Sequence, residues 1–150
     1  MTTWNDVVAA EPEFAARVRA IFDARRHKTI ATLRADGSPR ISGIETEFAD
    51  GELCFGSMPG ARKGADLRRD PRCALHSASD DPPEDGAGWR GDAKIAGRAV
   101  FTGPLDGGPD GDRFSVEIRE VVWTGLNDEL TMLVIETWTP DGGLRRVERA

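Results

Sequence analysis

Two Asp-Gly turns divide residues 28–57 into three strand-like segments, and this pattern limits the possible folds more than any other feature. The segments are KTIATLR (28–34), PRISGIETEF (39–48) and ELCFGS (52–57). Asp36-Gly37 and Asp50-Gly51 lie between them. Asp-Gly between alternating segments is a strong hairpin signal, because glycine tolerates the positive φ that tight turns need. The sequence therefore predicts an antiparallel meander.

The rest of the chain predicts more strands and two helices. Residues 11–26 place Phe14, Val18, Ile21 and Phe22 at helical spacing, and residues 61–71 form a short helix-like segment that ends at a proline. Further strand-like segments are 72–79, 93–103, 112–126, 129–138 and 143–149, with a change of phase at Val121-Val122 that suggests a bulge. Short strands at close intervals are typical of a small β-barrel. We expect one mainly β domain over residues 1–150, with six to eight antiparallel strands.

Composition excludes several classes of function. The net charge of −6 and the calculated pI near 5.0 argue against a nucleic-acid partner, since neutralising phosphates dominates that affinity. No apolar segment approaches the roughly 20 residues that cross a bilayer, and the N-terminus does not resemble a secretory signal. Cys54 and Cys73 suit free buried thiols, and no spacing of Cys and His resembles a zinc site. The expected location is the cytoplasm, with no metal and no membrane partner.

One segment is strongly basic in this acidic chain. Five of the eleven residues 62–72 are Arg or Lys, and they follow a strand and a Gly-containing loop. A helix start after such a loop presents unpaired N–H groups and binds phosphate readily. The segment lacks the Gly-Lys-Ser/Thr of an ATP-binding loop, and a solvated helix face is the competing interpretation. If the second and third strands are neighbours, an anion pocket can form from Arg40, Ser57, Arg62 and Lys63.

These segments resemble the FMN-binding split-barrel family best known from pyridoxamine 5′-phosphate oxidase. The resemblance rests on DGSPRIS (36–42), on LCFGSMPGARKGADLRRDPRCALHS (53–77) and on KIAGRAVF (94–101), and residues 113–149 fit more loosely. It implies a split β-barrel with an N-terminal helix and a short helix after the third strand. It further implies an oxidoreductase that transfers hydride to or from a small molecule and works as a homodimer with the cofactor at the subunit interface. The FMN phosphate would be held by Arg40, Ser57, Arg62 and Lys63.

Several positions depart from the family pattern. Ala61 stands where many oxidases have Ser, Gly56 where an aromatic is common, and Glu45 where a Lys is common. Asp92 stands near the position of a Gln that contacts the flavin, and the C-terminus GLRRVERA lacks the tail that binds the vitamin phosphate. The resemblance therefore indicates shared ancestry rather than the oxidase reaction.

Three alternatives stay open at this point. Split barrels also serve a deazaflavin coenzyme, and both cofactors need a phosphate site at a helix start. A non-catalytic module that binds flavin or haem would give the same sequence, as would a dimeric scaffold whose pocket has decayed. No catalytic residue can be assigned from the sequence.

The remaining candidates have structural interpretations that compete with the functional ones. Trp123 and Trp138 fit either the core or an intersubunit cofactor site, His76 fits either packing or the cofactor, and Trp89 fits either a loop or a lid. The C-terminal arginines, Arg145, Arg146 and Arg149, either add to an intersubunit site or protect an edge strand. Arg68, Arg69 and Arg72 are expected at the surface.

Overall fold

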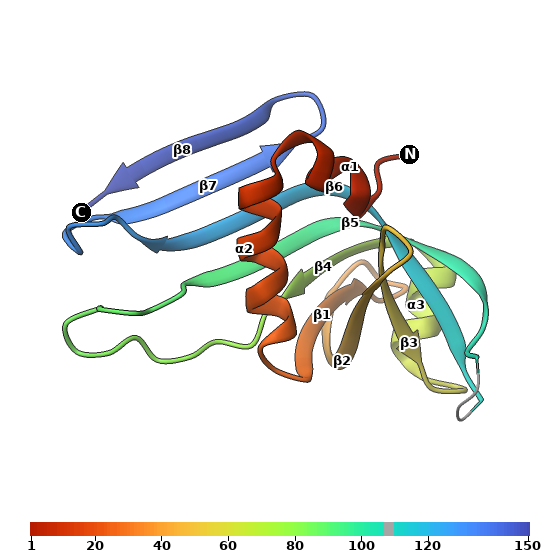
Figure 1. The fold of residues 1–150 in the computed structure, drawn as a ribbon. Helices are drawn as coiled ribbons and strands as arrows, with labels where there is room; N and C mark the ends of the chain where they lie inside the picture. The colour runs from red at the N-terminus through yellow and green to blue at the C-terminus, as the bar shows by residue number, and fades with distance from the viewer. Residues whose placement is uncertain (107–109) are drawn as a thin grey trace.

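The computed structural model describes residues 1–106 and 110–150, and these ranges hold three helices and eight strands (Figure 1). The elements in chain order are α1 (Trp4–Ala10), α2 (Pro12–Asp23), β1 (His27–Leu33), β2 (Pro39–Ala49), β3 (Glu52–Ser57), α3 (Arg62–Arg69), β4 (Arg72–His76), β5 (Asp92–Pro104), β6 (Asp112–Leu126), β7 (Leu133–Thr139) and β8 (Gly143–Arg149). The predicted mainly β chain, its N-terminal helix and its short helix after the third strand are confirmed.

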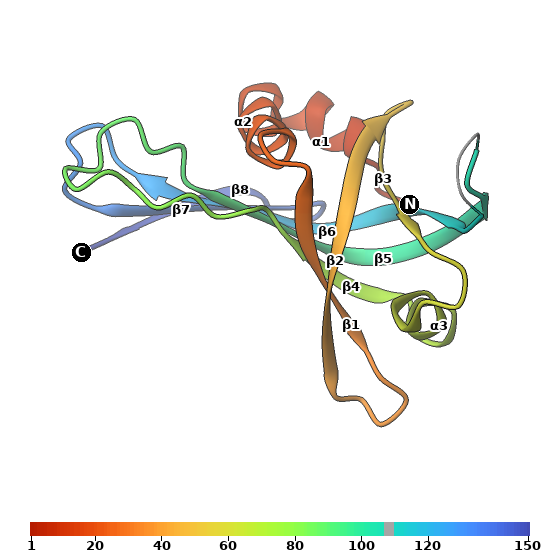
Figure 2. The same cartoon turned by 90° about the horizontal axis from the view of Figure 1, so that it is seen from below.

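Six of the strands close into a barrel. Their order is β3-β2-β1-β4-β5-β6, and antiparallel pairing between β3 and β6 closes the ring, with Ser57 opposite Asp112. β7 and β8 extend the sheet beyond the barrel, from the second half of β6. Figure 2 shows this extension projecting to one side, together with the segment that joins β4 to β5. The split barrel that the resemblance implied is therefore confirmed.

The bulge predicted near Val121 lies in β6 slightly earlier. Ala96 of β5 pairs with Glu120, whereas the next residue, Gly97, pairs with Ile118, so Arg119 is the extra residue. A Cβ atom on Gly97 would overlap a backbone carbonyl of β6, which explains why this position is a glycine. The bulge lets β6 turn from the barrel toward β7.

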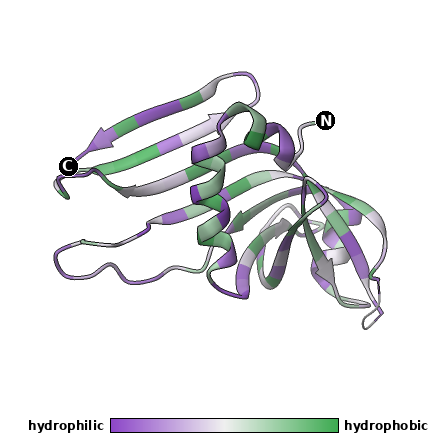
Figure 3. Cartoon of the chain, in the orientation of Figure 1, coloured by the Kyte–Doolittle hydropathy of each residue, from purple (hydrophilic) through white to green (hydrophobic). Residues whose placement is uncertain are grey.

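Helix α2 packs the predicted apolar stripe onto the sheet. Phe14, Val18 and Phe22 are each at most 2% exposed, and Pro12 occupies the first turn, where its missing N–H costs nothing. Figure 3 shows hydrophobic and hydrophilic positions alternating along α2, while β8 at the far edge is mostly hydrophilic. The largest buried partners from the strands are Ile30, Leu53, Leu75, Ile95, Phe114 and Ile118.

Helix α1 was not predicted, although its start has a readable signal. The Thr3 side chain accepts a hydrogen bond from the Asp6 N–H, and the Asp6 carboxylate accepts one from the Thr3 N–H. This reciprocal capping stabilises a helix start, and Thr-x-x-Asp is its sequence form. Trp4 is buried against Phe48, with 4.7 Å between ring centroids. α1 therefore covers the same side of the barrel as α2.

Helix α3 lies on the opposite side of the barrel from α1 and α2 (Figure 2). Its buried residue Leu67 packs into the core cluster. Within the described residues, no helix combines the length and the apolar character that crossing a bilayer requires.

Candidate functional site

The start of α3 has backbone donors that no side chain caps. The loop after β3 turns at Gly60, whose φ is +71°, and the Ala61 N–H bonds to the Met58 carbonyl at 3.1 Å. Ala61 occupies the N-cap position and has no side-chain oxygen, so the N–H groups of the first turn lack a side-chain acceptor. These N–H groups and the helix dipole favour an anion.

Ser57 lies beside this helix start at the end of β3. The residue is 1% exposed, and its Oγ has no hydrogen-bond partner among the described residues. A Cβ atom on Gly64 would stand 2.9 Å from this Oγ, so only glycine lets the first turn of α3 approach so closely. A buried hydroxyl without a partner is costly unless a ligand completes it.

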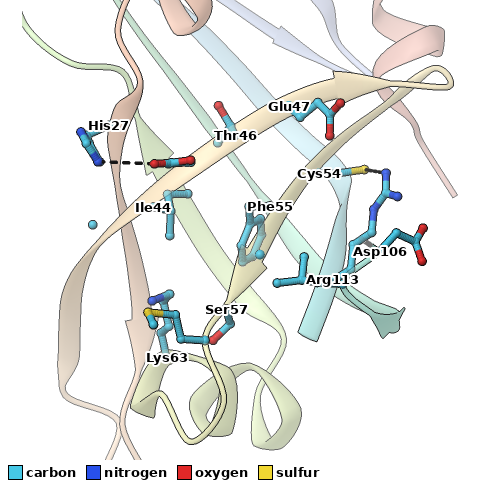
Figure 4. Close-up of a pocket in the computed structure, with 15 residues that line it drawn as sticks. His27, Ile44, Thr46, Glu47, Cys54, Phe55, Ser57, Lys63, Asp106 and Arg113 are labelled. Atoms are coloured by element: carbon cyan, nitrogen blue, oxygen red, sulfur yellow. Dashed lines mark hydrogen bonds and ion pairs between the residues drawn. The ribbon is translucent and has the colours of Figure 1, made fainter. Parts of the chain in front are cut away.

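Ser57 and Lys63 line the same depression, which we call the β2–β3 cleft. The cleft has a volume of about 650 Å³, within the usual range for small-molecule sites. Figure 4 shows Ser57 and Lys63 at its α3 end, with Ile44 and Phe55 along its floor. The described residues that line it are His27, Gly43, Ile44, Glu45, Thr46, Glu47, Cys54, Phe55, Gly56, Ser57, Met58, Lys63, Leu105, Asp106 and Arg113.

Charge is unevenly distributed along the cleft. Lys63 stands at the α3 end, and Arg113 at the other end donates to the Cys54 Sγ at 3.3 Å (Figure 4). Glu45 also lines the cleft and lies 3.5 Å from the His27 Nε2, with both side chains largely exposed. Glu47 and Asp106 add two more carboxylates, so among the described residues that line the cleft the donors for an anion are concentrated at the α3 end.

Gly56 departs from the family pattern, and the structure gives a reason. A Cβ atom on Gly56 would stand 2.9 Å from a methyl group of Leu105, which comes from the segment after β5. Leu105 therefore fills the space where an aromatic side chain at position 56 would begin. The wall of the cleft stays apolar, but a residue distant in sequence supplies it.

Arg40 and Arg62, the other two predicted phosphate ligands, line a second depression, which we call the arginine hollow. This hollow has a volume of about 460 Å³ and lies between the β1–β2 turn and α3, lined by Arg34, Ala35, Asp36, Arg40, Arg62, Ala65, Asp66 and Arg69. The structure thus brings Ser57 together with Lys63, and Arg40 together with Arg62, on different sides of α3. Pairing between β2 and β3 covers only residues 46–49 of β2, so Arg40 lies beyond it.

Asp66 organises the arginine hollow, and the sequence analysis did not identify it. Its carboxylate is buried and accepts hydrogen bonds from Thr32 Oγ1 at 2.8 Å, Arg40 Nε at 2.7 Å and Arg69 Nη2 at 3.0 Å. Burial alone would raise the pKa of Asp66, but the hydrogen bonds from Arg40, Thr32 and Arg69 outweigh it and lower the pKa to about 2. The i, i+3 spacing of Asp66 and Arg69 was the available signal.

The two tryptophans on late strands belong to the core. Trp123 is 8% exposed, donates its indole N–H to the Arg90 carbonyl, and lies under the Arg17 guanidinium at 4.6 Å. Trp138 is 5% exposed. Trp89 is half-buried and lines a small cavity beside Ile21, so it does not cover either depression. The packing interpretation is confirmed for Trp123 and Trp138.

Of the other candidate residues named in the sequence analysis, Arg69 lines the arginine hollow, and the rest lie outside both the hollow and the β2–β3 cleft. His76 is half-buried, with its Nδ1 2.6 Å from the Ser77 carbonyl oxygen. Arg68 and Arg72 are exposed and pair with nearby aspartates. Arg69 is exposed as predicted, but it also bonds Asp66 and the Leu33 carbonyl. The C-terminal arginines Arg145, Arg146 and Arg149 lie on exposed β8.

Comparison with known proteins agrees with this fold. The family model described as pyridoxamine 5′-phosphate oxidase matches residues 14–114, which extends the resemblance to include α2. No curated protein sequence is similar enough to the chain to count as a match.

Solved structures share the architecture at low sequence identity. PhzG from Burkholderia lata 383, solved with tetrahydrophenazine-1-carboxylic acid, gives a TM-score of 0.65 at 13% identity, over 95% of this chain and 90% of that one. A pyridoxamine 5′-phosphate oxidase-related FMN-binding protein from Nostoc punctiforme PCC 73102 gives 0.62 at 11% identity, over 100% and 98%. An F420 reductase gives 0.53 at 16% identity, over 67% and 91%. Because the family model covers more than half of the residues, this chain belongs to the pyridoxamine 5′-phosphate oxidase family.

Proposed function

We propose that the protein is a flavin-dependent oxidoreductase that binds FMN in the β2–β3 cleft, with the cofactor phosphate at the start of α3. The Ser57 Oγ carries the proposal, because it is buried and has no partner among the described residues. A phosphate oxygen there would accept hydrogen bonds from the Ser57 hydroxyl and from the uncapped N–H groups of α3, and the Lys63 ammonium would pair with its charge.

Support for the four predicted ligands is unequal. Ser57 and Lys63 line the cleft itself, whereas Arg40 and Arg62 line the arginine hollow. Arg62 is the first residue of α3, so its charge adds to the positive potential at the helix start from the other side. Arg40 is held by Asp66 at 2.7 Å and is therefore the weakest of the four candidates for direct contact.

The rest of the cleft suits an aromatic ring system. Ile44, Phe55 and Leu105 give it apolar surface, and the carboxylates lie away from the proposed phosphate position. A bound flavin would supply the hydride chemistry, and the chain would position it and set its electrostatic surroundings. The proposed substrate is a small molecule that exchanges hydride with the bound cofactor.

A deazaflavin coenzyme is the second candidate, and the structural similarity to an F420 reductase favours including it. The test is the absorption spectrum of the purified protein, followed by titration of the apo-protein with FMN and with the deazaflavin coenzyme. Tighter binding of FMN supports the proposal, and tighter binding of deazaflavin favours the second candidate. A haem absorption band, or a bound flavin that neither NADPH nor reduced deazaflavin can reduce, would favour a non-catalytic binding module. If neither cofactor binds, the proposal fails.

Lys63→Ala tests the position of the phosphate. Losing one charged hydrogen bond to phosphate should weaken FMN affinity by roughly tenfold or more, while the melting temperature of the apo-protein stays nearly constant. Lys94→Ala is the matched control, because Lys94 is an exposed lysine on β5 outside the cleft. Equal FMN affinity in Lys63→Ala and Lys94→Ala would overturn the phosphate assignment.

We also propose a homodimer, with the cofactor cleft at the interface. Ile41 is 76% exposed on the same face of β2 as Gly43 of the cleft, and Met58 of the cleft is 69% exposed. Such side chains next to a ligand site suit burial against a second copy. Analytical ultracentrifugation should give a dimer for the wild type and a shift toward monomer for Ile41→Asp. A monomeric wild type would refute the interface.

A further inference from the structure

We infer that the substrate of the β2–β3 cleft carries a positively charged group, such as a protonated amine, which is recognised by carboxylates at the end of the cleft away from α3. These carboxylates are Glu45, Glu47 and Asp106, and we call this part of the cleft its acidic end. The inference rests on the proposed function, because it concerns the small molecule that would lie in the cleft together with the bound cofactor.

Two strands of evidence place these carboxylates around one open space. Glu45 and Glu47 are two residues apart on β2, so they lie on the same face of the strand, and Asp106 comes from the segment after β5. Gly43 precedes the glutamates on that face, and a Cβ atom there would meet no atom within 4 Å. The space beside the glutamates is therefore free for a ligand.

The carboxylates of the acidic end have few partners of their own. Glu47 and Asp106 make no side-chain hydrogen bond or ion pair with the described residues, although both line the cleft. Glu45 lies 3.5 Å from the His27 Nε2, a contact that is an ion pair only when His27 is protonated. The aspartates in and beside α3, in contrast, each pair with an arginine. The acidic end thus keeps its oxygen atoms available for a ligand.

Arg113 reduces the negative charge of the acidic end without cancelling it. It donates to the Cys54 Sγ at 3.3 Å, and Figure 4 shows it near Glu47 and Asp106. The pKa of Arg113 is raised, chiefly by its hydrogen bond to Cys54 and further by the negative charges of Glu47 and Asp106. Three carboxylates against one guanidinium leave a net charge of −2 when His27 is neutral. A cleft with this sign of charge attracts cations and repels anions.

A separate observation shows that these carboxylates belong to a ligand site and not to a solvated surface. Ser57 lines the same cleft, is 1% exposed, and has an Oγ without a hydrogen-bond partner among the described residues. A buried hydroxyl of this kind indicates a missing ligand whatever the charge of its surroundings. The cleft therefore has a phosphate position at one end and a negative potential at the other.

The floor of the cleft defines the rest of the substrate. Ile44 and Phe55 line it and are 4% and 3% exposed, so they give it a fixed apolar surface. Apolar surface with a few polar groups that fix orientation is the usual composition of a small-molecule site. The expected substrate class is an amine with an apolar or aromatic body, and phosphate or carboxylate substrates are disfavoured.

The test compares three probes of similar size that differ in charge: benzylamine, benzyl alcohol and benzoate. Each is titrated into the 15N-labelled full chain, with and without FMN, and binding is followed by the NMR shifts of the cleft amides. Benzylamine should bind about tenfold tighter than benzoate, with benzyl alcohol between them, because each exposed carboxylate contributes up to about fivefold. The preference should shrink as salt is added, since exposed charges are screened.

The double variant Glu45→Gln/Glu47→Gln assigns the preference to these residues. It should weaken benzylamine binding by about fivefold or more and change benzyl alcohol binding by less than about twofold. Glu84→Gln is the matched control, because Glu84 is an exposed glutamate in the segment between β4 and β5, outside the cleft. It should leave the affinity of every probe within about twofold of the wild type.

Three results would overturn the inference. The first is an absence of saturable benzylamine binding, or equal affinities for benzylamine and benzoate. The second is an equal loss of benzylamine affinity in the double variant and in Glu84→Gln. The third is a preference for benzylamine that disappears once FMN is bound, because the cofactor would then occupy the acidic end. The proposed function fails separately, when neither FMN nor deazaflavin binds, and the titration without FMN still measures the charge preference in that case.

Discussion

Replacing Asp66 with asparagine removes the negative charge that holds Arg40 and Arg69 in place. Asp66 is 3% exposed, and its two carboxylate oxygens accept hydrogen bonds from Thr32, Arg40 and Arg69. Asparagine keeps the size and one acceptor oxygen but leaves Arg40, whose side chain is 19% exposed, without its counter-charge. We expect Asp66→Asn to fold and to be clearly less stable than the wild type at neutral pH.

The magnitude follows from the pKa of Asp66, which folding lowers from 3.8 to about 2. At about 1.4 kcal/mol per pKa unit, this difference stabilises the folded state by about 2.5 kcal/mol at pH 7. Because the folded pKa is the lower one, the contribution is fully present well above pH 3.8 and disappears as the pH falls through about 2. About half of it should remain near pH 3.

Urea unfolding followed by the fluorescence of the four tryptophans measures this contribution. The difference in unfolding free energy between wild type and Asp66→Asn should be about 2 to 3 kcal/mol at pH 7 and should shrink by about half at pH 3. Asp80→Asn is the control, since Asp80 pairs with Arg25 at 2.9 Å on an exposed surface and should cost less than about 1 kcal/mol. A difference at pH 7 no larger than that of the control, or one that does not shrink with acid, would refute the reasoning.

Two substitutions and one chemical modification each test a single feature of the structure. Gly64→Ala places a Cβ atom 2.9 Å from the Ser57 Oγ, so FMN affinity should fall by about fivefold or more in a binding titration, and an unchanged affinity would contradict the proposed contact. Gly97→Ala should cost about 2 kcal/mol or more in urea unfolding because its Cβ meets strand backbone, whereas Gly43→Ala, which meets nothing within 4 Å, should be nearly neutral. Burial raises the pKa of the Cys73 thiol to about 12, so alkylation at pH 8, followed by mass spectrometry, should spare it until the protein unfolds, and rapid labelling of the folded protein would refute this.

The strand order near the N-terminus could be predicted because its signals are local. Gly37 and Gly51 have φ values of +85° and +77°, as the Asp-Gly hairpin pattern requires. The period-two alternation of β1 and β2 and the apolar stripe of α2 likewise depend on residues close together in the sequence. The closing contact between β3 and β6 joins residues more than fifty positions apart, and no local signal in the sequence predicted this pairing.

The segment that forms the candidate site could be predicted from the sequence, but the arrangement of its residues in space could not. Ser57 and Lys63 share a cleft as expected, since a strand end and the next helix start are neighbours in space. The placement of Arg40 depended on how far β2 pairs with β3, and that register stops at residue 46. Leu105, which fills the space beside Gly56, is about fifty residues away from it and carries no motif. Long-range strand register and side-chain packing determine these positions, and neither can be predicted from the spacing of neighbouring residues in the sequence.

The adjacent residues Arg62 and Lys63 line different depressions, the arginine hollow and the β2–β3 cleft. Successive residues on a helix point about 100° apart, so a basic pair in the first turn places one charge on each side of α3. A strand end with a buried, unpartnered Ser57 hydroxyl faces one side, and a carboxylate that fixes two arginines, Asp66, faces the other. A helix face exposed only to water would need neither the buried Ser57 hydroxyl nor the Asp66 carboxylate, because water satisfies exposed arginines and lysines. The basic residues at this helix start are therefore better explained by Lys63 at the proposed phosphate position and by Arg69 on Asp66 than by a solvated surface alone.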